Sequence, residues 1–496
     1  MTTRLSFLKG GVKLGIGQMV AQASSFVRSL IVARLISPAD FGIAAIFSLT
    51  FSLLEMTSNL SAQTLLVQAE DGDNPRLQKT AHFIQSTRGL TNASLIFLLS
   101  GPISRLFGAP QARLAFAALA LVPLIRGFNH LDLYRVQREL KFGPSVSVDV
   151  ASNLLVTLAA VPLALALRNY WAMLWLLVAQ AVSYAVGSHW VAERRYGWTW
   201  DRIYTKRIFH FGWPLLINGL LLYGIFEGDR FLIGSAHRLF PRANYTLTDL
   251  GVYSVAFALA QAPSTTIGNI CLQLFLPFLS RAQQFQGQFQ RRYTASLHIV
   301  SLLGSLVAIG LVLVGGKVIP LAYGPKYASG GLYIGWLGAM WALRIFRAGP
   351  TQAAMALADP RNAMVSNMAR CLALVGGLLV AATGGRLVWF AIYGFLGDLL
   401  ALAVCVWRLQ VKHGVPARLC LGPLSAFAFG AGLSVLAVAG GAGKLNLALS
   451  LLLVGVLLAV QALGMILISA GLREEISVVI AKLRSYLAPV RIGDLS

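Results

Sequence analysis

The sequence has little charge for its length. Asp, Glu, Lys and Arg make up only 12% of its 496 residues, whereas 57% of the residues are hydrophobic. Soluble domains carry roughly 25% charged residues. The shortage of charge therefore excludes water-soluble fold classes and predicts an all-α protein that crosses a membrane many times.

Cysteine is also scarce, and the common catalytic motifs are absent. The four cysteines form no CxxC pair, and the seven histidines are scattered along the chain. We expect neither a disulfide framework nor a metal site. The sequence contains no GxxxxGK[ST] phosphate loop, no HExxH and no GxSxG. We therefore expect a protein that is not an enzyme and that holds no cofactor.

Acidic residues are the rarer of the two charged classes. The chain has 18 Asp and Glu against 41 Lys and Arg, which gives a net charge of +23. In a soluble protein this excess would suggest nucleic acid, but the sequence offers no soluble basic domain to bind it. Lys and Arg of membrane proteins gather in cytoplasmic loops beside anionic lipids. We expect contact with membrane lipids and none with nucleic acid.

Long apolar runs fill most of the chain. A membrane span needs about 20 apolar residues. Fourteen runs meet this length, and we expect them at 12–36, 42–67, 83–107, 113–133, 146–167, 171–191, 213–235, 250–276, 295–321, 331–356, 363–382, 387–408, 421–440 and 446–470. Basic residues concentrate in alternate loops, so both termini are expected in the cytoplasm.

The two halves of the chain share a short pattern. Asp40-Phe41-Gly42 opens the second run of the first half, and Asp249-Leu250-Gly251 opens the second run of the second half. The basic, aromatic linker 192–212 lies between these halves. We predict two six-helix lobes, 1–200 and 201–412, related as parallel repeats. Residues 413–496 would add helices 13 and 14 and a cytoplasmic tail.

Four stretches resemble a known family. They are VARLISPADFGIAAIF (32–47), LLVQAEDGDNPRLQKTAHFIQSTRG (65–89), QRELKFG (137–143) and LAYGPKYASGG (321–331). Together they are similar to the Wzx-type polysaccharide flippases of the MOP superfamily, which export lipid-linked oligosaccharides.

The resemblance implies a substrate and a way of working. The substrate would be a polyprenyl-pyrophosphate-linked oligosaccharide for surface polysaccharide biosynthesis in the cell envelope. Two lobes would move it by alternating access, coupled to a gradient of H⁺ or Na⁺. The resemblance also implies a location in the bacterial inner membrane, and polysaccharide polymerase machinery is the partner that it suggests.

Five arginines inside the predicted spans are candidates for substrate binding. A guanidinium binds phosphate oxygens through a bidentate fork, and a charge within a membrane helix tends to face a polar interior. These candidates are Arg28, Arg34, Arg230, Arg344 and Arg347. Other interpretations stay open, because Arg28 fits an ion pair, Arg34 fits snorkelling to the outer surface, and Arg344 fits a pair with Asp398.

Four acidic residues are candidates for ion coupling. They are Glu55, Glu227, Asp229 and Asp398. Glu55 fits a pair with Arg28 or Arg34 equally well, and Glu227 can neutralise Arg230 three residues further along the same helix. A second group of charges lies nearer the cytoplasmic ends of the spans and is interpreted as snorkelling or structural: Arg126, Asp149 and Arg370.

Two rival functions fit a polytopic membrane protein. A multidrug or cation antiporter of the same superfamily would need an acidic cavity, whereas this sequence offers arginines. A membrane-embedded polysaccharide polymerase or glycosyltransferase would need a large extracytoplasmic loop. The expected outer loop 237–249 has only about a dozen residues, which disfavours an enzyme.

The orientation can be tested by thiol labelling. In a background without the four native cysteines, Pro75→Cys and Trp200→Cys should resist a membrane-impermeant reagent in intact cells. Arg242→Cys should react, because it lies in an expected outer loop. Labelling of Trp200→Cys in sealed cells would reverse the predicted orientation.

Overall fold

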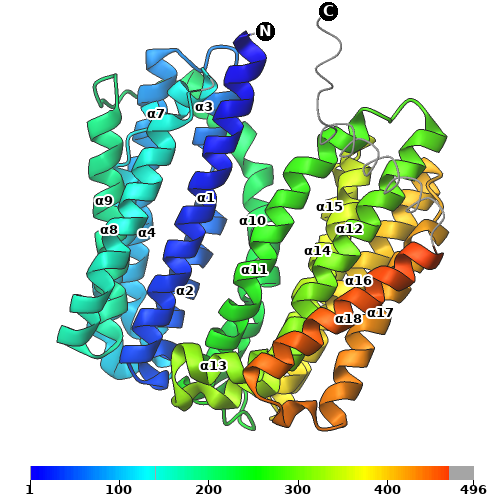
Figure 1. Ribbon diagram of the computed structural model, residues 1–496. Helices are drawn as coiled ribbons and strands as arrows, with labels where there is room; N and C mark the ends of the chain where they lie inside the picture. The colour runs from blue at the N-terminus through cyan, green and yellow to red at the C-terminus, as the bar shows by residue number, and fades with distance from the viewer. Residues whose placement is uncertain (1, 140, 469–496) are drawn as a thin grey trace, which may run out of the picture. The chain divides into compact units, whose positions relative to one another are not determined.

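The computed structural model describes residues 2–139 and 141–468 (Figure 1), and every regular element among them is helical. The elements of the first part of the chain are α1 Thr2–Leu35, α2 Pro38–Ser58, α3 Ala62–Gln68, α4 Pro75–Leu106, η1 Pro110–Ala112, α5 Arg113–Leu119, α6 Leu121–Gly127, α7 Asp132–Arg138, α8 Gly143–Leu167 and α9 Tyr170–Val191. Those of the second part are α10 Arg202–Leu239, α11 Leu247–Ser280, α12 Gln286–Leu313, α13 Gly315–Tyr323, η2 Pro325–Gly330, α14 Gly331–Ala356, α15 Arg361–Thr383, α16 Val388–His413, α17 Arg418–Ala439, η3 Ala442–Lys444 and α18 Leu447–Ile468.

The predicted fold class is confirmed, since the described chain is all-α and multi-spanning. Ten described helices are long and apolar enough to cross a membrane, or eleven if a bent pair counts as one span. The expected number of fourteen stays a prediction. The expected tail after residue 468 lies outside the described residues.

The expected span 42–67 is not one helix. It breaks after α2, where Ser61 has the left-handed φ of 51° and donates its backbone N–H to Asn59 Oδ1 at 2.9 Å. The short helix α3 follows the break. Asn and Ser offer such local side-chain bonds to the backbone, and these compete with a continuing helix. The apolar composition of the run hid this break.

The expected span 113–133 is broken as well. It consists of η1, α5 and α6, followed by α7, and the axes of Pro110–Gly127 and Asp132–Arg138 differ by 46°. The expected span 295–321 likewise ends early, because α12 stops at Leu313 and α13 begins at Gly315. By contrast, α14 has the predicted bounds.

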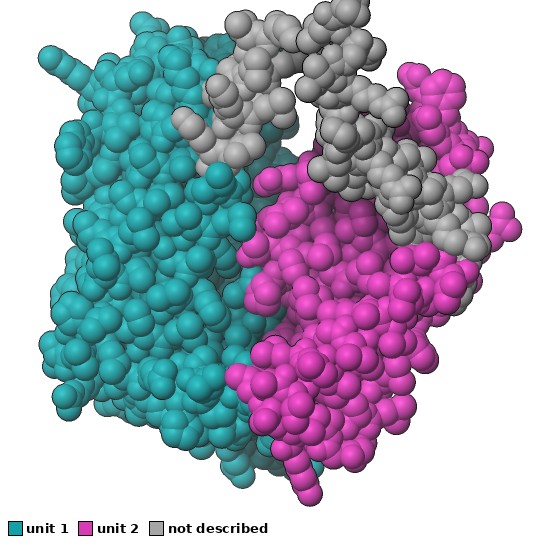
Figure 2. Space-filling view, in the orientation of Figure 1, with its two compact units in different colours: residues 1–262, 316–334, 370–397 teal, residues 263–315, 335–369, 398–496 magenta. Residues whose placement is uncertain are grey.

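The described residues fall into two compact units, coloured separately in Figure 2. Unit 1 comprises residues 1–262, 316–334 and 370–397, and unit 2 comprises 263–315, 335–369 and 398–496. The boundaries fall within α11, α13, α14, α15 and α16. The two six-helix lobes inferred from the sequence repeat stay a prediction.

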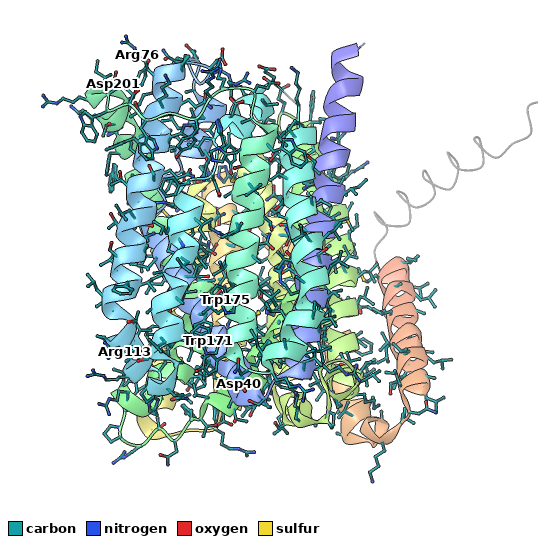
Figure 3. All side chains as sticks on the ribbon, turned by 90° about the vertical axis from the view of Figure 1, so that its left-hand side faces the viewer. Asp40, Arg76, Arg113, Trp171, Trp175 and Asp201 are labelled. Carbon is teal, nitrogen blue, oxygen red and sulfur yellow. The ribbon has the colours of Figure 1, made fainter. Side chains whose placement is uncertain are left out.

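Unit 1 presents its polar turns at two ends. Arg76 and Asp201, from expected inner segments, lie at one end, whereas Asp40 and Arg113, from expected outer segments, lie toward the other (Figure 3). The helix α2 starts at the second of these ends. The Ser37 hydroxyl accepts the backbone N–H of Asp40 at 3.1 Å, and Pro38 follows as the first helical residue. This is a favourable N-cap.

The glycines of the repeated pattern meet in unit 1. A Cβ at Gly42 would overlap the carbonyl oxygen of Leu247, and a Cβ at Gly251 would overlap that of Pro38. The first turns of α2 and α11 therefore pack backbone against backbone, each through the glycine of its own repeat. Only glycine permits so close an approach. The reciprocal contact gives the weak sequence repeat a physical reason.

Unit 2 is held by polar bonds between apolar helices. Ser301 of α12 donates to the carbonyl of Pro423 in α17 at 2.7 Å, and Gln461 of α18 donates to Ser305 at 2.8 Å. The rings of Phe346 and Phe427 lie 6.2 Å apart. Helices α17 and α18 thus pack on α12, and small hydroxyl side chains provide the closest contacts, as is common between membrane helices.

The glycine contact predicts a selective loss of stability. Gly42→Ala and Gly251→Ala should each destabilise the purified protein by about 1–3 kcal/mol, because the added methyl group displaces backbone. Gly268→Ala on the same helix α11 is a matched control, since a Cβ there meets nothing within 4 Å. Thermal unfolding in detergent measures all three. Equal midpoints for the three variants would contradict the contact.

Candidate functional site

A polar cavity of about 360 Å³ lies inside unit 1. Helices from α1 to α9 contribute its walls, and none of its lining side chains is exposed. The lining residues are Arg28, Glu55, Gln63, Gln85, Arg88, Arg126, Asn129, Tyr134, Asp149, Asn153, Gln180 and Tyr184. So many polar groups in the middle of apolar helices mark the principal candidate site.

Arg28 is the predicted substrate residue that lines this cavity. Its Nη1 donates to Gln180 Oε1 at 3.0 Å, and its Nη2 lies 3.4 Å from the hydroxyl oxygen of Ser25. Arg28 also lines a second cavity of about 240 Å³, together with Ser48 of α2 and Gln261 of α11. It therefore stands between two hollows, with neutral groups as its hydrogen-bond partners.

Glu55 also lines the cavity, but its ion pair differs from both expected pairs. Its carboxylate lies 3.1 Å from Nη2 of Arg88 on α4, so the expected pairing with Arg28 or Arg34 is wrong. Arg88 falls within the expected span 83–107 but was not named as a candidate. It lies on α4, which begins at Pro75, and its side chain is 14% exposed.

Arg126 and Asp149 are cavity residues that the sequence analysis had interpreted as snorkelling or structural. The Arg126 guanidinium lies 4.7 Å from the ring centroid of Phe51. Asp149 Oδ1 lies 3.4 Å from Nδ2 of Asn153, one turn along α8. The sequence signal for a cavity role was that Arg126 and Asp149 both lie inside expected spans, 113–133 and 146–167. Arg126 lies in the last turn of α6, just before the break that precedes α7, and lines the cavity.

Arg34 does not line either cavity. Its side chain is exposed at the end of α1, as expected for a residue that reaches the surface. Its carbonyl oxygen has a structural role, because it accepts a hydrogen bond from Lys326 Nζ at 3.0 Å.

The charges on α10 form a cluster of their own. Arg230 pairs with Glu227 three residues earlier and lies 4.5 Å from the ring centroid of Phe257. Asp229 accepts a hydrogen bond from the Tyr253 hydroxyl at 3.4 Å. The open interpretation in which Glu227 neutralises Arg230 thus describes this cluster. Arg230 does not line the cavities that contain Arg28.

The arginines of unit 2 have separate partners. Arg344 Nε lies 2.9 Å from Asp398 Oδ2, and its guanidinium lies 4.0 Å from the ring of Trp341. Arg347 donates instead to Asn367 at 3.0 Å and to Ser366 at 3.3 Å. Arg344 therefore follows the alternative in which Asp398 neutralises it. Arg347 keeps its charge, since its hydrogen-bond acceptors are neutral.

The first and last resemblance stretches meet at one end of unit 1. Lys326 Nζ donates to the carbonyls of Arg34 and Ile36 at the C-terminus of α1, and the rings of Phe41 and Tyr327 lie 6.1 Å apart. A lysine at a helix C-terminus satisfies free carbonyls and complements the helix dipole. Burial lowers the pKa of Lys326, while the Asp40 charge acts to raise it.

A buried carboxylate lies at the opposite end of unit 1. Asp132 pairs with Arg135 at 2.7 Å and accepts Gln78 Nε2 at 3.1 Å. It also accepts the backbone N–H groups of Glu193 and Arg194, just beyond α9, at 2.8 and 3.2 Å. This carboxylate links the end of the fourth expected span to the end of the sixth.

A carboxylate in unit 2 occupies the corresponding place in the second half. Asp359, after α14, lies 3.0 Å from Lys412 Nζ and 3.3 Å from His413 Nε2, and Arg408 lies 3.5 Å away. Burial acts to raise the pKa of Asp359, but the hydrogen bonds from Lys412 and His413 and the Arg408 charge hold it below its usual value. In each half of the sequence, an acid at or just beyond the end of the fourth expected span therefore binds residues at the end of the sixth expected span.

A family described as "Polysaccharide biosynthesis protein" matches residues 31–330 of this sequence. The matched range is well over half of the chain and contains the first three resemblance stretches and most of the fourth. The chain belongs to this family.

Curated relatives of this chain are distant. "Lipopolysaccharide biosynthesis protein WzxC" of Escherichia coli (strain K12) is 20% identical over 332 residues, which cover 66% of this chain and 65% of the relative. "Succinoglycan biosynthesis transport protein ExoT" of Rhizobium meliloti (strain 1021) is 22% identical over 310 residues, covering 61% and 60%. The chain thus spans slightly less than two thirds of their length.

Solved structures share the fold of this chain. The inward closed conformation of the lipid II flippase MurJ has a TM-score of 0.64 at 11% identity, covering 90% of this chain and 97% of its own. An inward-facing multidrug resistance MATE transporter of the MOP superfamily has a TM-score of 0.61 at 12% identity, covering 81% and 98%. These likenesses show that the chain shares the fold of both transporters.

The pair of Arg344 with Asp398 makes a prediction about stability. Asp398→Asn alone should destabilise the protein by about 3–5 kcal/mol, because it leaves a buried guanidinium without its acid. The double variant Arg344→Gln, Asp398→Asn should be less destabilised than this single variant. Thermal unfolding of the purified proteins measures the difference. A double variant no more stable than Asp398→Asn would show that the pair is not coupled.

Proposed function

We propose that this chain flips a polyprenyl-pyrophosphate-linked oligosaccharide from the inner to the outer leaflet of a bacterial inner membrane, for surface polysaccharide biosynthesis. Membership of the polysaccharide biosynthesis family supports this. So does the similarity to WzxC, a lipopolysaccharide biosynthesis protein, and to ExoT, a succinoglycan biosynthesis transport protein. The observation that carries the proposal is Arg28, a guanidinium between two cavities whose own hydrogen-bond partners are neutral.

The chemistry of such a substrate explains why a protein is needed. A pyrophosphate cannot enter the apolar bilayer unaided, because desolvating its charge costs too much. A guanidinium replaces the lost water with charge-assisted hydrogen bonds. Among the residues that the structure describes, no carboxylate lies within hydrogen-bonding distance of Arg28 or Arg347, so these two arginines are the proposed phosphate contacts.

The proposed movement is alternating access around a fixed site. Two contacts of unit 1 are the natural ones to break when the path opens outward. They are the glycine contact of α2 with α11 and the bonds from Lys326 to the end of α1. Both join segments from the first and second halves of the sequence. Coupling to H⁺ or Na⁺, and work beside a polysaccharide polymerase, belong to this proposal as well.

The rival functions fit these residues less well. A carrier for cationic drugs needs an acidic cavity. The cavity of unit 1 is instead lined by three arginines and only two acidic residues. A polymerase or glycosyltransferase needs room outside the membrane, yet only seven residues, 240–246, separate α10 from α11. We therefore propose a transporter with cytoplasmic termini.

Export of glycan tests the two arginines. Arg28→Gln and Arg347→Gln should each reduce surface polysaccharide by about tenfold to a hundredfold, since a hydrogen bond to a charged group contributes about 1.5–3 kcal/mol. Surface glycan and accumulated lipid-linked precursor are measured at matched protein levels. Arg238→Gln is the control, because Arg238 is exposed in the last turn of α10. Normal export by both test variants would remove the arginines from the substrate path.

A further inference from the structure

The polar cavity of unit 1 carries an excess of positive charge. Three arginines and two carboxylates line it: Arg28, Arg88, Arg126, Glu55 and Asp149. An unbalanced charge away from water is costly, since the interior screens it far less than bulk solvent does. The cavity therefore favours a guest with one negative charge.

The local contacts show where the excess charge resides. Glu55 neutralises Arg88 at 3.1 Å. Arg28 contacts an amide and a hydroxyl, and Arg126 contacts the face of Phe51. No carboxylate lies within 4.0 Å of either of these last two guanidinium groups among the residues that the structure describes. Asp149, the remaining acid, balances only one of them.

The cavity also holds an unused donor. Arg88 Nη1 is buried and has no hydrogen-bond partner among the described residues. A buried N–H group without an acceptor is unfavourable, so it is a place where an anion or water would bind. An acceptor of negative charge there satisfies both the donor and the excess charge.

We propose that this cavity is a binding site for a small inorganic anion, of which chloride is the test case. A cation such as Na⁺ would raise the excess charge, and a proton added to Asp149 would do the same. A volume of about 360 Å³ holds on the order of ten waters, at about 30 Å³ for each. A hydrated halide or a single phosphate group fits this space, whereas an oligosaccharide does not.

Arg28 would connect the anion to transport, and this step rests on the proposed function. The same guanidinium lines the second cavity, beside Ser48 and Gln261. A substrate phosphate that bound Arg28 from that side would compete with the anion for one charge. The anion would then keep Arg28 neutralised when no substrate is present, and substrate would weaken anion binding by the same factor in return.

The experiment measures chloride binding by the purified full chain in detergent. Chloride replaces gluconate at constant sodium and ionic strength, and the thermal midpoint is followed, since a ligand of the folded state raises it saturably. Arg126→Gln should raise the apparent dissociation constant by about tenfold, and Asp149→Asn should lower it, because each alters the local charge by one unit in opposite directions. Arg238→Gln should leave it unchanged.

Arg126→Gln and Asp149→Asn together decide whether the bound ion is an anion or a cation. Loss of chloride binding in Asp149→Asn would overturn the proposal. So would a midpoint that is the same in chloride and gluconate, or one that instead follows sodium when choline replaces it. If Arg126→Gln fails to fold, Arg126→Lys should retain binding, and Asp149→Asn still gives the sign.

Inorganic phosphate and a short-chain polyprenyl phosphate form the other arms. Stabilisation by phosphate as well as chloride supports a site for free anions. Stabilisation by the polyprenyl phosphate alone would assign the chemistry to the carrier lipid and overturn the proposal. These measurements need no export, so a failed anion site leaves the proposed flippase intact, and a failed flippase leaves the anion site intact.

Discussion

A guanidinium inside a bundle of apolar helices must find its acceptors within the protein, because the hydrocarbon around it offers none. The rest of the structure can be understood from the different ways in which this requirement is met. Asp398 neutralises Arg344 and Glu227 neutralises Arg230, so these arginines stabilise their own surroundings. Arg28 and Arg347 are satisfied by neutral groups and keep a charge that a guest can use. A buried arginine is therefore a sign of function only once its partner is known.

The stretches that identify the family hold segments of the helical scaffold together. Lys326 of the last stretch bonds the end of α1 in the first, and the first turns of α2 and α11 touch through Gly42 and Gly251. At the other end, Arg138 donates to the carbonyl of Glu70, which joins the two middle stretches. Their residues donate hydrogen bonds to free carbonyls at helix termini and permit close contacts between helices. This explains why they indicate the fold and the family strongly and say little about the glycan.

The repeat in the sequence has a counterpart in the arrangement of charges. Asp132 lies at the end of the fourth expected span of the first half, Asp359 lies just after that of the second half, and each binds the end of the sixth. The partners differ, because Asp132 accepts backbone N–H groups whereas Asp359 accepts Lys412 and His413. The two acids thus have similar positions and different partners. Such an anchor fixes the distance between two helices, which a moving bundle needs if each half is to stay rigid.

The sequence alone determined the helical class, the membrane setting and most helix positions, because hydrophobicity over twenty residues decides these locally. α14 has its predicted bounds for this reason. It could not determine where a helix breaks without proline, as at Ser61, or which charge meets which. Arg88 forms an ion pair with Glu55, and Arg126 and Asp149 line one cavity. Both arrangements arise because α4, α6 and α8 pack around the same space. Pairing across helices depends on packing and rotation, which no single stretch of sequence encodes, so the tertiary structure alone decided the site.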